Sequence, residues 1–184
     1  MSDIQLYYGD CLEVMDVLIA MGVKVDAIIT DPPYGTTACK WDTVIPFEEM
    51  WKRLKLLRKD NTPILLFGSE PFSSYLRLSN IKEYKYDWIW HKSKTGSALL
   101  AKQRPMSKHE IISVFYKNQP IYNPQMTKGA PYKRHLKYNI DRPNNHNWGI
   151  KEINVTNDGV RYPETVLTFQ QKWRRQDQLH PTQK

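Results

Sequence analysis

The chain has 184 residues, a length that suits one domain with a buried core. Of these residues 40% are hydrophobic and 25% charged, a composition too apolar for a disordered chain. No apolar run reaches the roughly 18–20 residues of a membrane span, the start lacks the pattern of a signal peptide, and the two cysteines and five histidines show no metal-binding spacing. We therefore expect a cytoplasmic protein that needs no metal. The net charge of +8 divides unevenly, with 11 basic and 13 acidic residues in 1–92 but 16 basic and 6 acidic in 93–184, so the second half favours an anionic partner.

The alternation of apolar and polar residues predicts strands and helices in turn. In chain order we expect a strand over residues 4–8, a helix over 11–21 capped by Asp10, a buried strand over 25–30, a helix over 47–58, a buried strand over 63–67, a helix over 71–78, strands over 84–91 and 110–116, and a return strand over 165–169. Short apolar strands between helices are typical of an α/β fold with a mostly parallel sheet and helices on both faces. Residues 118–162 follow neither periodicity, so we expect an irregular insert there.

The sequence Asp31-Pro32-Pro33-Tyr34 follows a predicted buried strand, and ligands of open α/β sheets bind at the carboxyl ends of the strands. Two prolines fix the backbone and offer carbonyl oxygens but no N–H groups. The Asp31 carboxylate and the Pro32 carbonyl could accept both N–H groups of a nucleobase amine and free its lone pair for attack. Tyr34 would stack on a base that has left the duplex. These four residues are therefore the predicted catalytic residues.

The sequence resembles the DNA amino-methyltransferases with the DPPY signature, in particular the adenine-N6 branch found in bacteriophages, prophages and restriction–modification systems. Besides the DPPY loop, the resemblance rests on Tyr8-Gly9-Asp10-Cys11-Leu12, Phe67-Gly68-Ser69, Lys108-His109-Glu110 with Val114-Phe115-Tyr116, and His180-Pro181-Thr182-Gln183-Lys184. This motif order, with the catalytic loop first, is that of the beta class. The resemblance implies a Rossmann-like methyltransferase sheet, S-adenosylmethionine as the methyl donor, and double-stranded DNA as the partner.

The resemblance also implies a division of the chain and a role for each part. It indicates a catalytic core over residues 1–117, a target-recognition insert over 118–164, and a return segment over 165–184. The segment around Glu110 resembles the strand that borders the target-base pocket. Contacts with the cofactor are expected from Asp10, Cys11, Asp31, His180, Pro181, Thr182, Gln183 and Lys184. Contacts with DNA are expected from Lys128, Lys133, Arg134, Lys137, Arg142 and Lys151.

A glycine-rich segment that family members carry after the HPTQKP element has no counterpart in this sequence, which contains no Gly-x-Gly. We therefore expect an incomplete methyltransferase core, either because the sequence is truncated before this segment or because a homodimer partner or a second chain supplies the rest. On this hypothesis the chain alone binds S-adenosylmethionine weakly or not at all. Micromolar binding in isothermal titration calorimetry would contradict it.

Three alternatives to adenine-N6 methylation stay open. Cytosine-N4 methylation acts on an electronically similar amine, although Asp31 stands where many cytosine-N4 enzymes have serine. A catalytically silent DNA-binding remnant would explain the absent glycine-rich segment. A methyltransferase acting on an amine of RNA or protein could use a related loop, although the basic insert favours duplex DNA.

Overall fold

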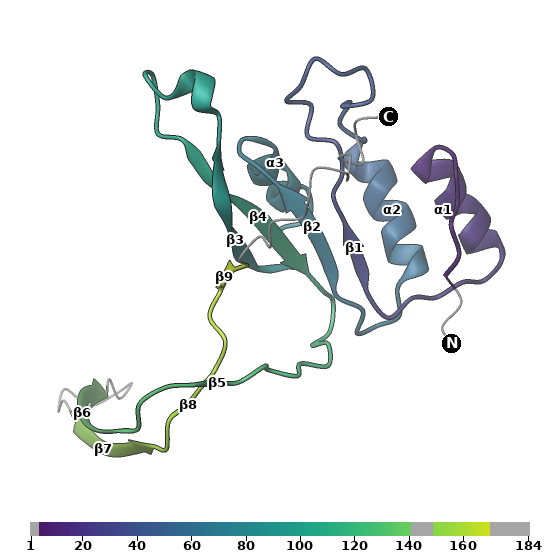
Figure 1. Cartoon of the computed structure of the whole chain (residues 1–184). Coiled ribbons are helices and arrows are strands. Elements are labelled where there is room, and N and C mark those ends of the chain that lie inside the picture. Colours follow the sequence, from purple (N-terminus) through teal and green to yellow (C-terminus); the bar gives the residue numbers. More distant parts are fainter. Residues whose placement is uncertain (1–3, 141–148, 170–184) are drawn as a thin grey trace. The chain divides into compact units, whose positions relative to one another are not determined.

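The computed structural model describes residues 4–140 and 149–169, and the chain divides into two compact units (Figure 1). The first unit contains the chain up to Ile121 and the segment that starts at Thr165, and the second unit is Tyr122–Glu164. The second unit lies within residues 118–164, the stretch expected as an insert. Each unit is described by itself below.

The described helices of the first unit are α1 (Cys11–Ala20), α2 (Phe47–Leu57) and α3 (Phe72–Ser79), as the periodicity predicted within one or two residues. Asp10 caps α1 as expected, since its Oδ1 accepts hydrogen bonds from the backbone N–H groups of Leu12 at 2.8 Å and Glu13 at 3.4 Å. In α2, the side chains that recur at helical spacing are the buried ones, namely Met50, Trp51, Leu54 and Leu57.

The centre of the first unit is a five-stranded sheet with the order β1-β2-β4-β3-β9 in the described residues. Its strands are β1 (Ile28–Thr30), β2 (Ile64–Gly68), β3 (Tyr84–Gly96), β4 (Ser107–Phe115) and β9 (Val166–Thr168). The pairs β1–β2 and β3–β9 are parallel, whereas β4 is antiparallel to both of its neighbours, so the sheet is mixed and only β4 runs against the common direction. A short connection containing the 3-10 helix η1 (Ala98–Leu100) joins β3 to β4, and only antiparallel strands can be joined so closely.

One apolar cluster joins the helices to the sheet. Ile64 and Leu66 of β2 and Phe115 of β4 are fully buried, and the Trp51 ring packs edge-on against Phe115 with the centroids 4.8 Å apart. The remaining members are Met50, Leu54, Phe72 and Leu76, and Met15 of α1 packs against the cluster. The cluster thus joins α2 and α3 to the face of β2 that carries Ile64 and Leu66, and α1 packs against this cluster. The first unit thus has the expected α/β fold, built on a mixed sheet, and the alternate residues Leu65 and Phe67 on the other face of β2 are partly buried.

The two strands predicted nearest the N-terminus are shorter than expected or absent. Residues 4–8 form no strand, and Ile4 and Leu6 are 86% and 91% exposed. The strand predicted over 25–30 is reduced to β1, where Ile29 is 66% exposed, while Val25 makes an isolated bridge to Arg58. The backbone N–H and C=O groups of a strand need hydrogen-bond partners on a neighbouring strand. In the described residues β1 has β2 as its single neighbouring strand, so it is paired on one side only.

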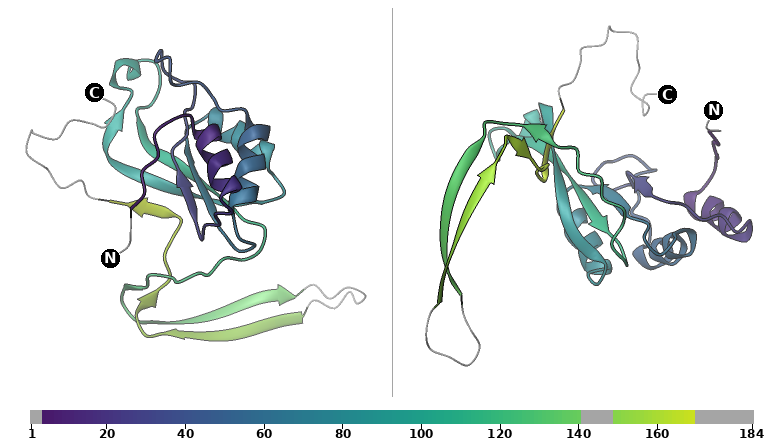
Figure 2. Two further views of the ribbon diagram at one scale, coloured as in Figure 1. Left: turned by 90° about the vertical axis from the view of Figure 1, so that its right-hand side faces the viewer. Right: turned by 90° about the horizontal axis from the view of Figure 1, so that it is seen from below.

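The second unit contains a two-stranded antiparallel ribbon instead of the expected irregular insert (Figure 2). The ribbon pairs β6 (Tyr132–Ile140) with β7 (Gly149–Asn157), and at its base β5 (Thr127–Lys128) pairs with β8 (Val160–Arg161). The Gly129 N–H donates to the Gly159 carbonyl at 2.7 Å. Gly159 has a φ of +101°, and a Cβ there would lie 2.6 Å from the Gly129 oxygen, so this close approach requires glycine.

Candidate active site and nucleic-acid interface

The DPPY loop starts directly after β1, at the edge of the sheet where the parallel strands β1, β2 and β3 have their carboxyl ends. Asp31 is exposed and Pro32 is buried. The Tyr34 hydroxyl donates a hydrogen bond to Asp31 Oδ1, and the Tyr34 ring packs against Phe72 of α3 with the ring centroids 5.1 Å apart. The structure thus brings Asp31 and Tyr34 together and anchors the tyrosine ring on α3.

Tyr34 remains a neutral hydrogen-bond donor. Burial of its hydroxyl raises its pKa, and the hydrogen bond to Asp31 and the negative charges of Asp31, Glu110 and Asp42 raise it further. The hydrogen bond uses only Oδ1 of Asp31. The other carboxylate oxygen of Asp31, Oδ2, does not accept this hydrogen bond. Because Asp31 is exposed, Oδ2 can accept a hydrogen bond from a ligand.

Asp42 organises the backbone that follows Tyr34, a role that the sequence analysis missed. Its side chain is buried and accepts hydrogen bonds from three successive backbone N–H groups: Oδ1 from Gly35 at 2.8 Å, and Oδ2 from Thr36 at 2.9 Å and Thr37 at 2.7 Å. Hydrogen bonding by Thr37, Gly35 and Thr36 lowers the pKa of Asp42 to about 2. The signal in the sequence was a short polar loop after the DPPY residues, whose backbone N–H groups require an acceptor, with an aspartate a few residues further on.

Aromatic and charged side chains of β2, β3 and β4 line up beside this edge. Trp90 lies opposite Glu110 in the β3–β4 ladder and packs edge-on against Phe67, with the ring centroids 6.2 Å apart. Lys92 forms an ion pair with Glu110, and its Nζ lies 5.5 Å from the Trp90 ring centroid. The negative charge of Glu110 is one of those that raise the pKa of Tyr34.

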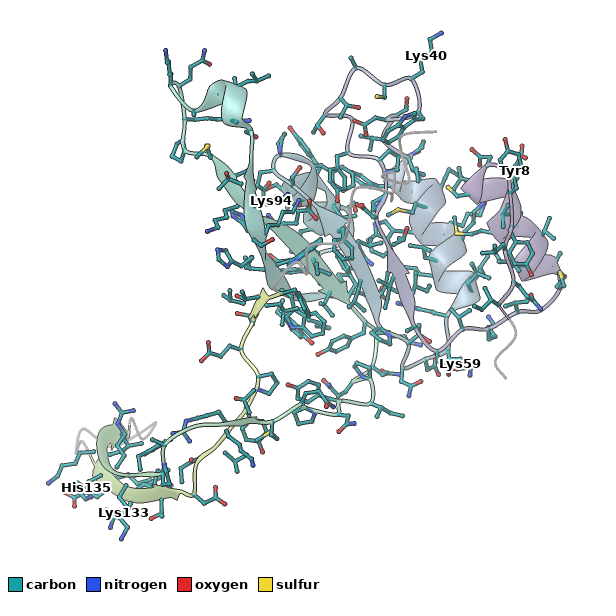
Figure 3. The ribbon with its side chains drawn as sticks, in the orientation of Figure 1. Tyr8, Lys40, Lys59, Lys94, Lys133 and His135 are labelled. Carbon is teal, nitrogen blue, oxygen red and sulfur yellow. The ribbon has the colours of Figure 1, made fainter. Side chains whose placement is uncertain are left out.

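The residues expected to bind the cofactor divide into two groups. Asp10 and Cys11 stand at the start of α1, beside the fully exposed Tyr8 that Figure 3 labels. Partial burial and the Asp10 charge raise the pKa of the Cys11 thiol. Among the described residues, no hydrogen bond or ion pair joins Asp10 or Cys11 to the DPPY loop. The residues His180, Pro181, Thr182, Gln183 and Lys184 lie outside the described ranges.

The basic residues expected to bind DNA lie on the second unit, and all those described are exposed. Lys128 is in β5, while Lys133, Arg134 and Lys137 follow along β6 and Lys151 is in β7; Arg142 lies outside the described residues. Because side chains alternate along a strand, Lys133 and Lys137 share one face of the ribbon and Arg134 lies on the other. Figure 3 labels Lys133 and His135 on this ribbon. Lys137 also pairs with Glu152 at 2.6 Å.

Neither a cluster of metal ligands nor a membrane-spanning helix occurs in the described residues. No group of three or more histidine, cysteine, aspartate or glutamate side chains in residues 4–140 and 149–169 could hold a metal ion. In the same residues, no helix has the length and apolar character required to cross a membrane.

Comparisons with known proteins point to one family. A family model described as DNA methylase, N6_N4_Mtase, matches residues 25–184. Solved structures of M1.HpyAVI, one of them in complex with SAM, are similar to this chain at 25% sequence identity and a TM-score of 0.50. The similarity covers 65% of this chain and 60% or 59% of the two M1.HpyAVI chains, so this chain spans about three fifths of their length. No curated protein matches the chain.

Proposed function

The chain belongs to the N6_N4_Mtase family of DNA methylases, and from this premise we propose that it is a site-specific DNA methyltransferase acting on the N6 amino group of a flipped adenine. The observation that carries the proposal is the DPPY loop at the carboxyl end of β1, with an exposed Asp31 carboxylate beside an anchored Tyr34. The proposed methyl donor is S-adenosylmethionine, as in the SAM complex of M1.HpyAVI.

The loop is suited to making a weakly nucleophilic amine reactive. Asp31 Oδ2 and the Pro32 carbonyl would each accept one N–H of the adenine amine, while Tyr34 holds Oδ1 in place. The amine nitrogen then becomes pyramidal, and its lone pair is free to form a bond to a methyl carbon. Bound S-adenosylmethionine would supply an electrophilic methyl group whose bond to sulfur breaks as the new C–N bond forms. Fixed acceptors at such a site contribute several kcal/mol to the transition state, and the surplus proton leaves afterwards.

The start of α1 offers a fit for the adenosine part of the cofactor. Asp10 uses only Oδ1 for the helix cap, so Oδ2 can accept hydrogen bonds from ribose hydroxyl groups. Cys11, at the first position of α1, is exposed beside it. We propose Asp10, Cys11 and Asp31 as the cofactor contacts among the described residues.

The second unit is the proposed target-recognition element. The major groove of B-DNA admits a two-stranded β-ribbon, and β6–β7 is such a ribbon. Basic residues on both of its faces, Lys133 on one and Arg134 on the other, would reach the phosphates of both groove walls. Because basic residues lie on both faces of the ribbon, we favour its insertion into the groove between the two DNA backbones over docking of a single ribbon face on the duplex.

The decisive experiment identifies the methylated nucleoside. DNA incubated with the protein and S-adenosylmethionine would be digested to nucleosides and analysed by mass spectrometry, and N6-methyladenine is the expected product. N4-methylcytosine would establish the alternative cytosine activity. The Asp31→Ala variant should lose methylation and keep its affinity for duplex DNA, whereas Asp26→Ala, which removes an exposed carboxylate before β1, should keep both. Duplex binding without methylation by the wild type would indicate the silent DNA-binding remnant.

A phage or restriction–modification role follows from the sequence resemblance alone and stays a prediction. The same holds for a homodimer partner or a second chain that completes the site. Sedimentation of the protein with and without duplex DNA would test the first of these two assemblies.

A further inference from the structure

The hairpin formed by β3 and β4 extends beyond the sheet that contains it. Pairing of β3 with β9 reaches His91, and pairing of β4 with β2 reaches Ile111. Beyond these residues, within the described part of the chain, β3 and β4 pair only with each other, at Gly96 opposite Ser107 after a register shift that follows His91. Figure 1 shows this part, residues 91–109, projecting from the sheet, and we call it the arm.

The tip of the arm is ordered by its own backbone. Backbone hydrogen bonds close it from Leu100 N–H to Ser97 at 3.0 Å and from Gln103 N–H to Leu100 at 2.9 Å, around the short helix η1. This ordered tip displays Leu99, whose side chain is 99% exposed, and Met106 is 45% exposed nearby in the sequence. The arm thus presents a fully exposed leucine on a tip that local backbone hydrogen bonds close.

The arm is also strongly basic. Residues 88–109 contain five lysine or arginine residues and no acidic residue. Lys92, at the base of the arm, pairs with Glu110, while the other four are exposed, namely Lys94, Lys102, Arg104 and Lys108. Figure 3 labels Lys94 on the projecting part of β3. Duplex DNA has the matching chemistry, because its apolar stacked base pairs lie between negatively charged phosphates. The exposed leucine would contact the bases, and the positive charges around it would contact the phosphates.

The arm rises from the same edge of the sheet as the DPPY loop. β1 and β3 run in the same direction, so the arm that continues β3 and the loop that follows β1 leave the sheet at the same end. Glu110, at the base of the arm, carries one of the negative charges that raise the pKa of Tyr34. A duplex that places a base at the DPPY loop would therefore also pass the arm.

We propose that the arm is a second DNA-contacting element, in which Leu99 inserts between base pairs while Lys102 and Arg104 bind phosphates. The inference rests on the proposed function, because it takes the duplex at the DPPY loop as its starting point. An inserted leucine unstacks a base step, and unstacking lowers the cost of extruding the neighbouring base. None of these residues belongs to the set expected to bind DNA from the sequence.

Two variants separate the apolar contact from the charged contacts. Leu99→Ala should weaken binding to a fluorescein-labelled duplex roughly tenfold or more, because the leucine side chain would be buried only in the complex with DNA and this burial is lost. The salt dependence of binding should not change. The double variant Lys102→Gln/Arg104→Gln should lower the slope of log K against log salt by about 2, because each phosphate contact contributes about 0.9. Controls are Leu78→Ala, a 69% exposed leucine on α3, and Lys52→Gln/Lys55→Gln on α2.

Unstacking is read directly with 2-aminopurine placed in the duplex, since its fluorescence rises when it leaves the stack. The wild type and Leu78→Ala should raise the fluorescence, and Leu99→Ala should not. Thermal unfolding of each variant verifies that the fold is intact. If the wild type methylates DNA but Leu99→Ala matches Leu78→Ala in both measurements, the arm inference is wrong and the proposed function stands. If the wild type binds no duplex at all, both are wrong.

Discussion

A partly buried ion pair fixes the end of α2 to the start of β3, and breaking it should have a measurable cost. Arg58 Nη1 and Nη2 donate to Glu83 Oε2 and Oε1 at 2.8 and 2.7 Å, and the two side chains are 8% and 17% exposed. Asn80 Nδ2 also donates to Glu83 Oε2 at 3.0 Å. The substitution Glu83→Gln removes the negative charge, keeps the shape, and leaves the buried Arg58 guanidinium without its counter-ion.

The magnitude follows from the titration of Glu83. Hydrogen bonding by Arg58, and further bonding by Asn80, lowers its pKa from 4.5 to about 2. At about 1.4 kcal/mol per pKa unit, this difference corresponds to about 3 kcal/mol of unfolding free energy at neutral pH. Removing one partner of a buried ion pair independently costs about 3–5 kcal/mol. We therefore expect Glu83→Gln to lower the unfolding free energy at pH 7 by about 3 kcal/mol.

The effect should shrink in acid. A carboxyl group with a lowered pKa in the folded state stabilises the protein fully above its ordinary pKa of 4.5, and this contribution disappears as the pH falls through about 2. At pH 3 only about 1.4 kcal/mol of it remains by the same relation. Urea unfolding of the wild type and Glu83→Gln at both pH values measures the two differences.

A matched control is Asp60→Asn, which breaks the exposed pair with Lys117, whose side chains are 82% and 57% exposed. An exposed pair contributes little, so this variant should unfold at the wild-type urea concentration. The reasoning would be refuted by a Glu83→Gln effect that is equal at pH 7 and pH 3, or by an equal loss in the Asp60→Asn control.

Three further predictions concern the core and the loop. Leu66→Ala, at a fully buried position of β2, should lower the unfolding free energy by about 3–4 kcal/mol in urea unfolding, and a loss under about 1 kcal/mol would contradict the core assignment. Asp42→Asn should abolish hydrogen-exchange protection of the Thr36 and Thr37 amides, which donate to its carboxylate; unchanged protection would disprove its role in the loop. Tyr34→Phe keeps the ring against Phe72 but removes the hydrogen bond to Asp31, so it should lose less methylation rate than Tyr34→Ala, which should lose about ten- to a hundredfold; equal rates of the two variants would exclude stacking by Tyr34.

Local signals in the sequence were sufficient for the helices and the central strands. The Asp10 cap and the spacing of Met50, Trp51 and Leu54 placed α1 and α2, because one residue or one helical face determines each of them. The DPPY loop was located for the same reason, since its position depends only on the strand before it. Its pairing of Tyr34 with Asp31 could not be derived, because the ring is held by Phe72 far along the chain.

The ribbon of the second unit was missed because its first strand, β6, has no apolar periodicity, and the alternation of Ile153 and Val155 in β7 is short. Along β6 the sequence Tyr-Lys-Arg-His-Leu-Lys alternates no apolar residues with polar ones, so no face identifies a strand. Its stabilising contacts are cross-strand pairs, such as His135 with Asn154 and Lys137 with Glu152, which exist only after the two strands meet. Asp42 was missed similarly, since its function depends on a loop that folds back on it.

The small β5–β8 pairing has a consequence for the order of folding. About 50 residues separate the end of β4 from the start of β9, and β9 can join β3 only after that long loop has closed. Pairing of Thr127 with Arg161 reduces the free loop to about 15 residues, which lowers the entropy cost of closure by about 1 kcal/mol. The ribbon beyond this pairing then adds nothing to the cost of this second closure, because its own closure belongs to the β5–β8 pairing. Once β5 and β8 have paired, the joining of β9 to β3 does not depend on the length of the ribbon.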